Sequence, residues 1–175
     1  MALRTIRENG DAILLKKSRL VVDFNERLHT LLDDMAETME AANGVGLAAP
    51  QVGVLRRAVV VLETNVPEGE EPHIIELVNP AIIATDGEQL GTEGCLSVPG
   101  MYGFVSRPQY VKVRAQDRFG KVFEIEGEGL TARAFCHEID HLDGHLFTEL
   151  ADRLYTESEL EELAQEQDTT EMDEA

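Results

Sequence analysis

Tryptophan is absent from the 175-residue chain, which has only six phenylalanines and three tyrosines. A hydrophobic core must therefore rest mainly on Leu, Val, Ile and Ala. Hydrophobic residues still make up 43% of the chain and charged residues 28%, which is a globular composition rather than a disordered or fibrous one. The length suits one domain with a core large enough to fold unaided.

Basic residues are also scarce. Fifteen lysines and arginines face 34 acidic residues, giving a net charge of −19. Such a balance repels phosphate backbones and anionic lipids, which argues against DNA or membrane partners. The imbalance is greatest at the C-terminal end, where Arg153 is the only basic residue from Glu149 onward. We expect one folded domain over 1–155 and an acidic tail over 156–175.

Cysteine occurs only at Cys95 and Cys136. The sequence shows no secretory signal, and no segment approaches the roughly 20 apolar residues of a spanning helix. The expected location is therefore the cytoplasm, where a structural disulfide would be unusual. Each cysteine is expected to be a buried side chain, a metal ligand or a reactive thiol.

Hydrophobic periodicity predicts an α+β fold. Leucines and methionines recur every three or four residues over 25–42, which predicts an amphipathic helix capped by Asp23 or Asn25 and ended by Asn43-Gly44. A second helix is expected over 129–143, and a short one over 158–166 before a disordered end. Between the first two helices, apolar runs separated by turn residues predict strands over 57–62, 73–78, 81–84, 111–115 and 122–125.

The sharpest local signal is the run HEIDH, from His137 to His141. On a helix, positions four apart lie on one face, so both imidazoles can reach a single cation. Glu138 follows the first histidine and can act as general base and then general acid towards a water at that cation. The pattern also occurs in proteins without metal, so it needs a third ligand.

Several candidates compete for that role. His145 continues the spacing, but Asp143-Gly144 should end the helix before it. A metzincin-type protease would carry its histidine at position 147, where this chain has Phe147. A distant glutamate, as in thermolysin-type proteases, stays open. Cys95, preceded by a glycine, is the remaining candidate. With the two histidines it would complete a ligand set suited to Zn(II) or Fe(II) and leave the fourth coordination position for water. A lone cysteine is also a common core residue.

A third run, GVGLAAPQ, covers positions 44–51. Its glycines allow close backbone approach, and Gln51 ends it with a neutral donor amide. This run, EGCLS at 93–97 and HEIDH at 137–141 resemble the three signature motifs of the peptide deformylases in order and separation. The resemblance extends from Arg4 through Phe147, and the short spacing between the first two motifs matches the shorter bacterial type.

The resemblance implies an activity and a set of roles. The enzyme would remove the formyl group from formyl-methionyl nascent polypeptides and release formate. Cys95, His137 and His141 would bind one divalent metal, Fe(II) in the native enzyme, with Zn, Ni or Co able to substitute. A metal-bound water would attack the formyl carbon, with Glu138 as general base and acid. The Gln51 amide and the Leu96 N–H would stabilise the oxyanion. The helix carrying HExxH would lie at the centre of mostly antiparallel strands.

The resemblance also places substrate contacts. Gly46 would offer backbone hydrogen bonds to an extended peptide. Leu130, Arg133 and Ala134, which lie on the same helical face as His137, would form part of the methionine pocket, with the Arg133 methylenes supplying apolar surface. Tyr102 stands where some members have arginine.

Other residues and partners are expected to play lesser parts. Cys136 points away from the histidines and is expected to pack in the core, whereas Asp140 would either orient an imidazole or face solvent. The chain is expected to be a monomer. Some family members dock on the ribosome through a basic C-terminal extension, and the acidic tail puts that mode of docking in doubt. The two rival readings are a protease that cleaves internal peptide bonds and a protein with a structural metal site.

Overall fold

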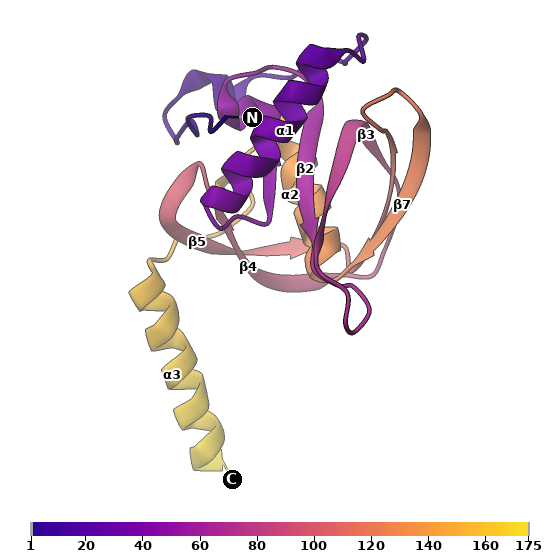
Figure 1. Cartoon of the computed structure of the whole chain (residues 1–175). Helices are drawn as coiled ribbons and strands as arrows, with labels where there is room; N and C mark the ends of the chain where they lie inside the picture. The colour runs from indigo at the N-terminus through magenta and orange to yellow at the C-terminus, as the bar shows by residue number, and fades with distance from the viewer. Residues whose placement is uncertain (1, 175) are drawn as a thin grey trace.

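The structure is a computed structural model that describes residues 2–174 (Figure 1). Its main sheet has five strands in the order β1-β2-β3-β6-β7, and every neighbouring pair is antiparallel. The strands are β1 (Gly46–Ala48), β2 (Ala58–Glu63), β3 (His73–Asp86), β6 (Tyr110–Gln116) and β7 (Val122–Glu128). A separate antiparallel hairpin consists of β4 (Gln89–Cys95) and β5 (Val98–Arg107).

The two long helices of the body pack on different sides of β2. α1 (Glu26–Ala41) shares a core cluster with Ala58 and Val60, and α2 (Leu130–Leu142) shares one with Val59 and Val61. This alternation is the two-residue period of a strand buried on both faces. α2 therefore lies between the main sheet and the β4–β5 hairpin, which confirms the expected α+β fold with HExxH on a central helix.

Local signals explain where these helices begin and end. The Asn25 side chain accepts a hydrogen bond from the Leu28 N–H and caps α1, whose last turn is followed by Asn43 at a φ of 55°. α2 ends at Leu142, and Gly144 then adopts a left-handed φ of 80°. His145 consequently lies beyond the helix, as the sequence predicted. Three short 3-10 helices, η1 (Ala12–Leu15), η2 (Ala49–Val52) and η3 (Phe147–Glu149), complete the body.

The strand predictions were incomplete. The two strands expected over 73–78 and 81–84 are one strand, β3, whose register shifts between Val78 and Ala81, next to Pro80. The β4–β5 hairpin was not predicted, and Pro99 and Gly100 lie within β5. Its glycines weaken a strand signal but allow close packing: a Cβ on Gly103 would lie 2.6 Å from the Ala151 side chain.

The C-terminal helix is longer than predicted. α3 (Glu157–Glu174) includes residues that were expected to be disordered. Thr156 and Glu159 form a reciprocal capping box at its start, and no glycine or proline interrupts it. Just before α3, Tyr155 exchanges two backbone hydrogen bonds with Tyr102 of β5, at 2.7 and 2.8 Å.

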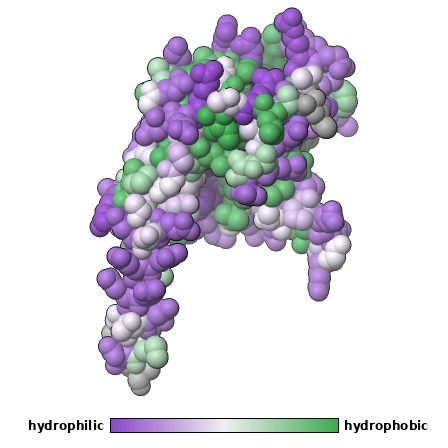
Figure 2. Space-filling view, turned by 60° about the vertical axis from the view of Figure 1, so that its left-hand side comes forward, coloured by the Kyte–Doolittle hydropathy of each residue, from purple (hydrophilic) through white to green (hydrophobic). Residues whose placement is uncertain are grey.

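From there α3 leaves the body (Figure 1), and its surface is mostly hydrophilic (Figure 2). No helix within residues 2–174 combines the length and the apolar character needed to cross a bilayer.

Candidate active site

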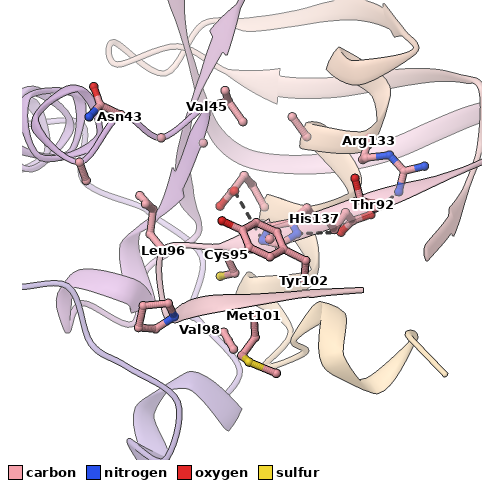
Figure 3. Close-up of a pocket in the computed structure, with 18 of the residues that line it drawn as sticks. Asn43, Val45, Thr92, Cys95, Leu96, Val98, Met101, Tyr102, Arg133 and His137 are labelled. Carbon is pink, nitrogen blue, oxygen red and sulfur yellow. Dashed lines mark hydrogen bonds and ion pairs between the residues drawn. The ribbon is translucent and has the colours of Figure 1, made fainter. Parts of the chain in front are cut away.

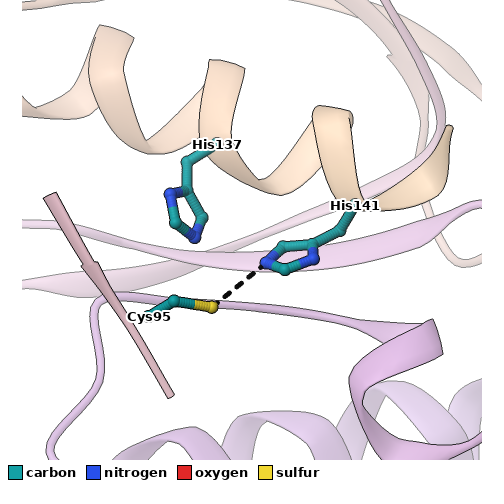
Figure 4. A group of neighbouring side chains, drawn as sticks. All are labelled: Cys95, His137 and His141. Carbon is teal, nitrogen blue, oxygen red and sulfur yellow. Dashed lines mark hydrogen bonds between the residues drawn. The ribbon is translucent and has the colours of Figure 1, made fainter. Parts of the chain in front are cut away.

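Three metal-binding side chains meet where the end of β4 faces α2 (Figure 4). One donor atom from each of Cys95, His137 and His141 lies within 4.8 Å of the other two, and the Cys95 Sγ is 3.4 Å from the His141 Nε2. Both imidazoles are buried and the thiol is half-buried. A thiolate with two imidazoles is a common donor set for divalent zinc or iron, so these residues fit such an ion.

Glu93 fixes the ring of His137. Its Oε1 accepts a hydrogen bond from the His137 Nδ1 at 2.8 Å, which leaves Nε2 as the donor atom of that ring. The same carboxylate accepts two bonds from Arg107, at 2.8 and 2.9 Å, and one from Arg133 at 2.7 Å. Burial favours a raised pKa for Glu93, but the hydrogen bonds from Arg107 and His137 outweigh it and lower the pKa to about 2.

Glu138 is enclosed beside the three candidate ligands. Its Oε1 lies 3.9 Å from the His137 Nε2, and its Oε2 has no hydrogen-bond partner within residues 2–174. Burial raises the pKa of Glu138 to about 7. Gly46 of β1 lies against this carboxylate: a Cβ added there would meet the Glu138 Oε1 at 2.5 Å. Only glycine leaves room for the carboxylate in this position.

Gln51 is held in a single orientation. Its Oε1 accepts from the Ala48 N–H at 2.9 Å, and its Nε2 donates to the Ser97 Oγ at 3.0 Å and lies 3.6 Å from the Cys95 Sγ. The amide donor therefore points towards the cluster. Leu96 follows Cys95 directly, in the turn between β4 and β5, and its side chain packs close to Gly44.

A cavity of about 500 Å³ opens over these groups (Figure 3). Gly46, Glu93, Cys95, His137 and Glu138 line its inner part. Its remaining walls come from the loop after α1, from the hairpin and from the first turns of α2, with Val45, Thr92, Leu96, Met101, Tyr102, Leu130, Arg133 and Ala134 among them. The cavity thus joins the cluster to a partly apolar chamber of the size that takes a side chain or a short peptide.

The proposed pocket residues differ in exposure and contacts. Leu130 is 58% exposed, whereas Ala134 and Arg133 are buried. The Arg133 guanidinium is bound to Glu93 and to the Val105 carbonyl, so its stem is the part left to line the cavity.

Other candidates lie outside the cluster. Cys136 is buried in the core between α2 and the sheet, as expected. His145 pairs with Glu149 instead of joining the other histidines. Within residues 2–174, the Asp140 side chain makes no hydrogen bond to a histidine ring and accepts one from Arg107 at 2.7 Å.

Glu93, Ser97 and Arg107 also belong to the site, and no role was predicted for them. Glu93 had a usable signal, because it stands two residues before Cys95 in a strand and therefore on the same face.

A family model described as polypeptide deformylase matches residues 3–157. The chain belongs to the peptide deformylase family. It is an enzyme that removes the N-formyl group from nascent peptides, and the family is metal-dependent.

Known proteins resemble the chain over nearly its whole body. The peptide deformylase of Lachnoclostridium phytofermentans is 61% identical over 149 residues, which cover 85% of this chain and 89% of that protein. A crystal structure of a peptide deformylase from Legionella pneumophila is 48% identical, with a TM-score of 0.78 and 86% of each chain covered. A Met-Ala-Ser-bound class I type b enzyme from Acinetobacter baumannii is 36% identical, with a TM-score of 0.79, and covers 85% of this chain and 98% of its own.

Proposed function

We propose that Cys95, His137 and His141 hold one divalent cation, Fe(II) in the cell, with Zn, Ni or Co able to replace it. The observation that carries this proposal is the convergence of the three donors beside a buried Glu138 oxygen that has no hydrogen-bond partner in the described part of the chain. When bound, such a cation supplies Lewis acidity, which makes water a competent nucleophile near neutral pH.

Within this site, Glu138 takes the proton of the attacking water and returns it to the leaving nitrogen. Gln51 and the Leu96 N–H donate to the formyl oxygen as negative charge develops on it. Gln51 suits this role because its other amide atom is already bound to Ala48, so the donor is fixed before substrate arrives. The products are formate and a free α-amine.

The peptide lies along the cavity with its methionine side chain between Leu130, the Arg133 stem and Ala134, and its backbone bonded at Gly46. All four residues line the same cavity. The relative with Met-Ala-Ser bound supports a methionine at the first position of the ligand.

Residues 1–155 form the catalytic domain, and residues 156–175 are dispensable for the reaction. The enzyme works as a monomer in the cytoplasm, where nascent chains leave the ribosome. The nine acidic residues of α3, which has no basic one, would be repelled by ribosomal RNA. Contact with the ribosome would therefore use protein surfaces.

The test is formate release from a short formyl-Met peptide by anaerobically purified protein, with metal measured on the same sample. We expect turnover with one equivalent of metal and its loss in Cys95→Ala and Glu138→Ala. Turnover that persists in Cys95→Ala with full metal would show that the ligand set is wrong. Cleavage of internal bonds in unformylated peptides would favour a protease instead.

A further inference from the structure

The proposed metal ligands come from two elements that share no backbone ladder. Cys95 ends β4, whereas His137 and His141 lie on α2. β4 and β5 form their own two-stranded sheet, apart from the five-stranded one. Side-chain contacts must therefore set the distance between the thiol and the imidazoles.

Apolar packing joins the hairpin to the segment that follows α2. Val98 and Val105 form a cluster with Phe147, and Ala151 and Leu154 pack against it. These partners belong to the segment that follows α2, and the cluster contains no residue of α2 itself. This cluster ties the hairpin to the C-terminal segment, and its Phe147 ring stacks on His137 of α2 with centroids 6.0 Å apart. A stacked ring pair can slide, so directed contacts are needed for alignment of the hairpin with the helix.

Buried ionic contacts provide that alignment. Arg107, the last residue of β5, bonds Glu93 with its Nε and one Nη, and bonds Asp140 of α2 with its other Nη at 2.7 Å. Arg133 reaches the opposite way, from α2 to Glu93 and the Val105 carbonyl. Arg133 and Asp140 stand one turn before His137 and nearly one turn after it, so the contacts bracket the first histidine.

We propose that Arg107 is a positioning residue: by joining Glu93 to Asp140 it fixes the hairpin against α2 and sets the separation between Cys95 and the two histidines. The inference rests on the metal set proposed above. Arg107 is 6% exposed, and its planar fork supplies three directed donors at once. A lysine can neutralise the charge but cannot hold both carboxylates in these directions.

Asp140→Asn is the more discriminating variant. It keeps the shape and one acceptor oxygen but removes the charge that faces Arg107. Asp143→Asn is a matched control, because Asp143 stands at the same end of α2 and pairs with Arg57 at 3.0 Å, with a side chain 40% exposed against 33% for Asp140. Among residues 2–174, the Asp143 side chain makes no hydrogen bond to Glu93, Arg107 or a proposed ligand.

The measurement is the rate at which the Co(II)-loaded enzyme passes its metal to excess chelator, well below the unfolding temperature. The thiolate–cobalt absorption reports on Cys95 in the same sample. We expect release to be about tenfold faster in Asp140→Asn and about 10–100-fold faster in Arg107→Lys, with a shifted spectrum, as for other residues that orient metal ligands. Asp143→Asn should release cobalt at the wild-type rate.

A merely structural role would lower the stability of the Asp140 and Asp143 variants alike and leave both spectra unchanged. Equal release rates in these two variants would therefore overturn the inference, even if Arg107→Lys failed to fold. A wild-type enzyme whose cobalt showed no thiolate absorption would overturn the ligand set itself, and the inference with it.

Discussion

Gly46→Ala should separate catalysis from folding. The added Cβ would lie 2.5 Å from the Glu138 Oε1 and 2.8 Å from both Cγ and Cδ. Unstrained contacts fall at about 3.5–4.0 Å, so the two groups must separate by roughly 1 Å. β1 is paired to β2 along its length and the carboxylate is enclosed. The strain therefore falls on the position of the proposed general base.

A misplacement of about 1 Å at a reacting group can cost about 10²-fold in rate, and overpacking a buried site costs about 1–3 kcal/mol of stability. We expect Gly46→Ala to remain folded, to lower kcat about 100-fold and to keep its metal. The assay is formate release under saturating formyl-Met peptide, with metal content and denaturant unfolding measured in parallel.

Gly127→Ala is the matched control. Its Cβ would also press on α2, at 2.8 Å from a Phe135 ring carbon and 2.9 Å from a Thr131 methyl, but away from the cavity. It should lose similar stability and keep its kcat within about threefold, since core strain alone seldom moves a distant site. A Gly46→Ala enzyme with nearly normal kcat, or a Gly127→Ala enzyme equally impaired, would refute the reasoning.

Three further changes test other parts of the site. Gln51→Ala should lower kcat by about 10²–10³ with metal intact, because one fixed oxyanion donor is lost; an unchanged kcat would remove Gln51 from that role. Glu93→Gln should weaken metal retention about 10–100-fold, measured by chelator competition, because the His137 ring loses its charged acceptor; normal retention would contradict this. Ending the chain after Thr156 should leave kcat and KM within about twofold, because it removes only an exposed terminus. Ending the chain after Asp152 should raise KM, because Tyr102 then loses its backbone pairing with Tyr155. Equal kinetics of the two truncations would show that this pairing does not support the pocket.

Local chemistry made part of the fold predictable. The Asn25 cap, the leucine and methionine stripe of α1 and the Asp143-Gly144 ending of α2 are short-range signals, and the structure confirms each. The β4–β5 hairpin lacks such a signal, because Gly94 and Gly103 serve tight packing against Tyr102 and Ala151 rather than strand propensity. Contacts of that kind exist only once distant segments have met.

The candidate site also contains one part that short-range spacing predicts and one part that depends on contacts between distant segments. His137 and His141 are four residues apart on one helix, so their spacing already indicates a shared face. The partners of Glu93 lie 14, 40 and 44 residues away, at Arg107, Arg133 and His137. No periodicity connects such positions, and a buried carboxylate that accepts four hydrogen bonds is recognisable only in three dimensions.

α3 extends away from the rest of the molecule as a single helix. Its 18 residues span roughly 27 Å at 1.5 Å per residue, and it points away from the body (Figure 1). A label or solid support attached beyond residue 174 would hold every molecule by the same end, with the cavity free. Enzyme immobilised in this way could remove formyl groups from peptides in a mixture without masking the site that selects them.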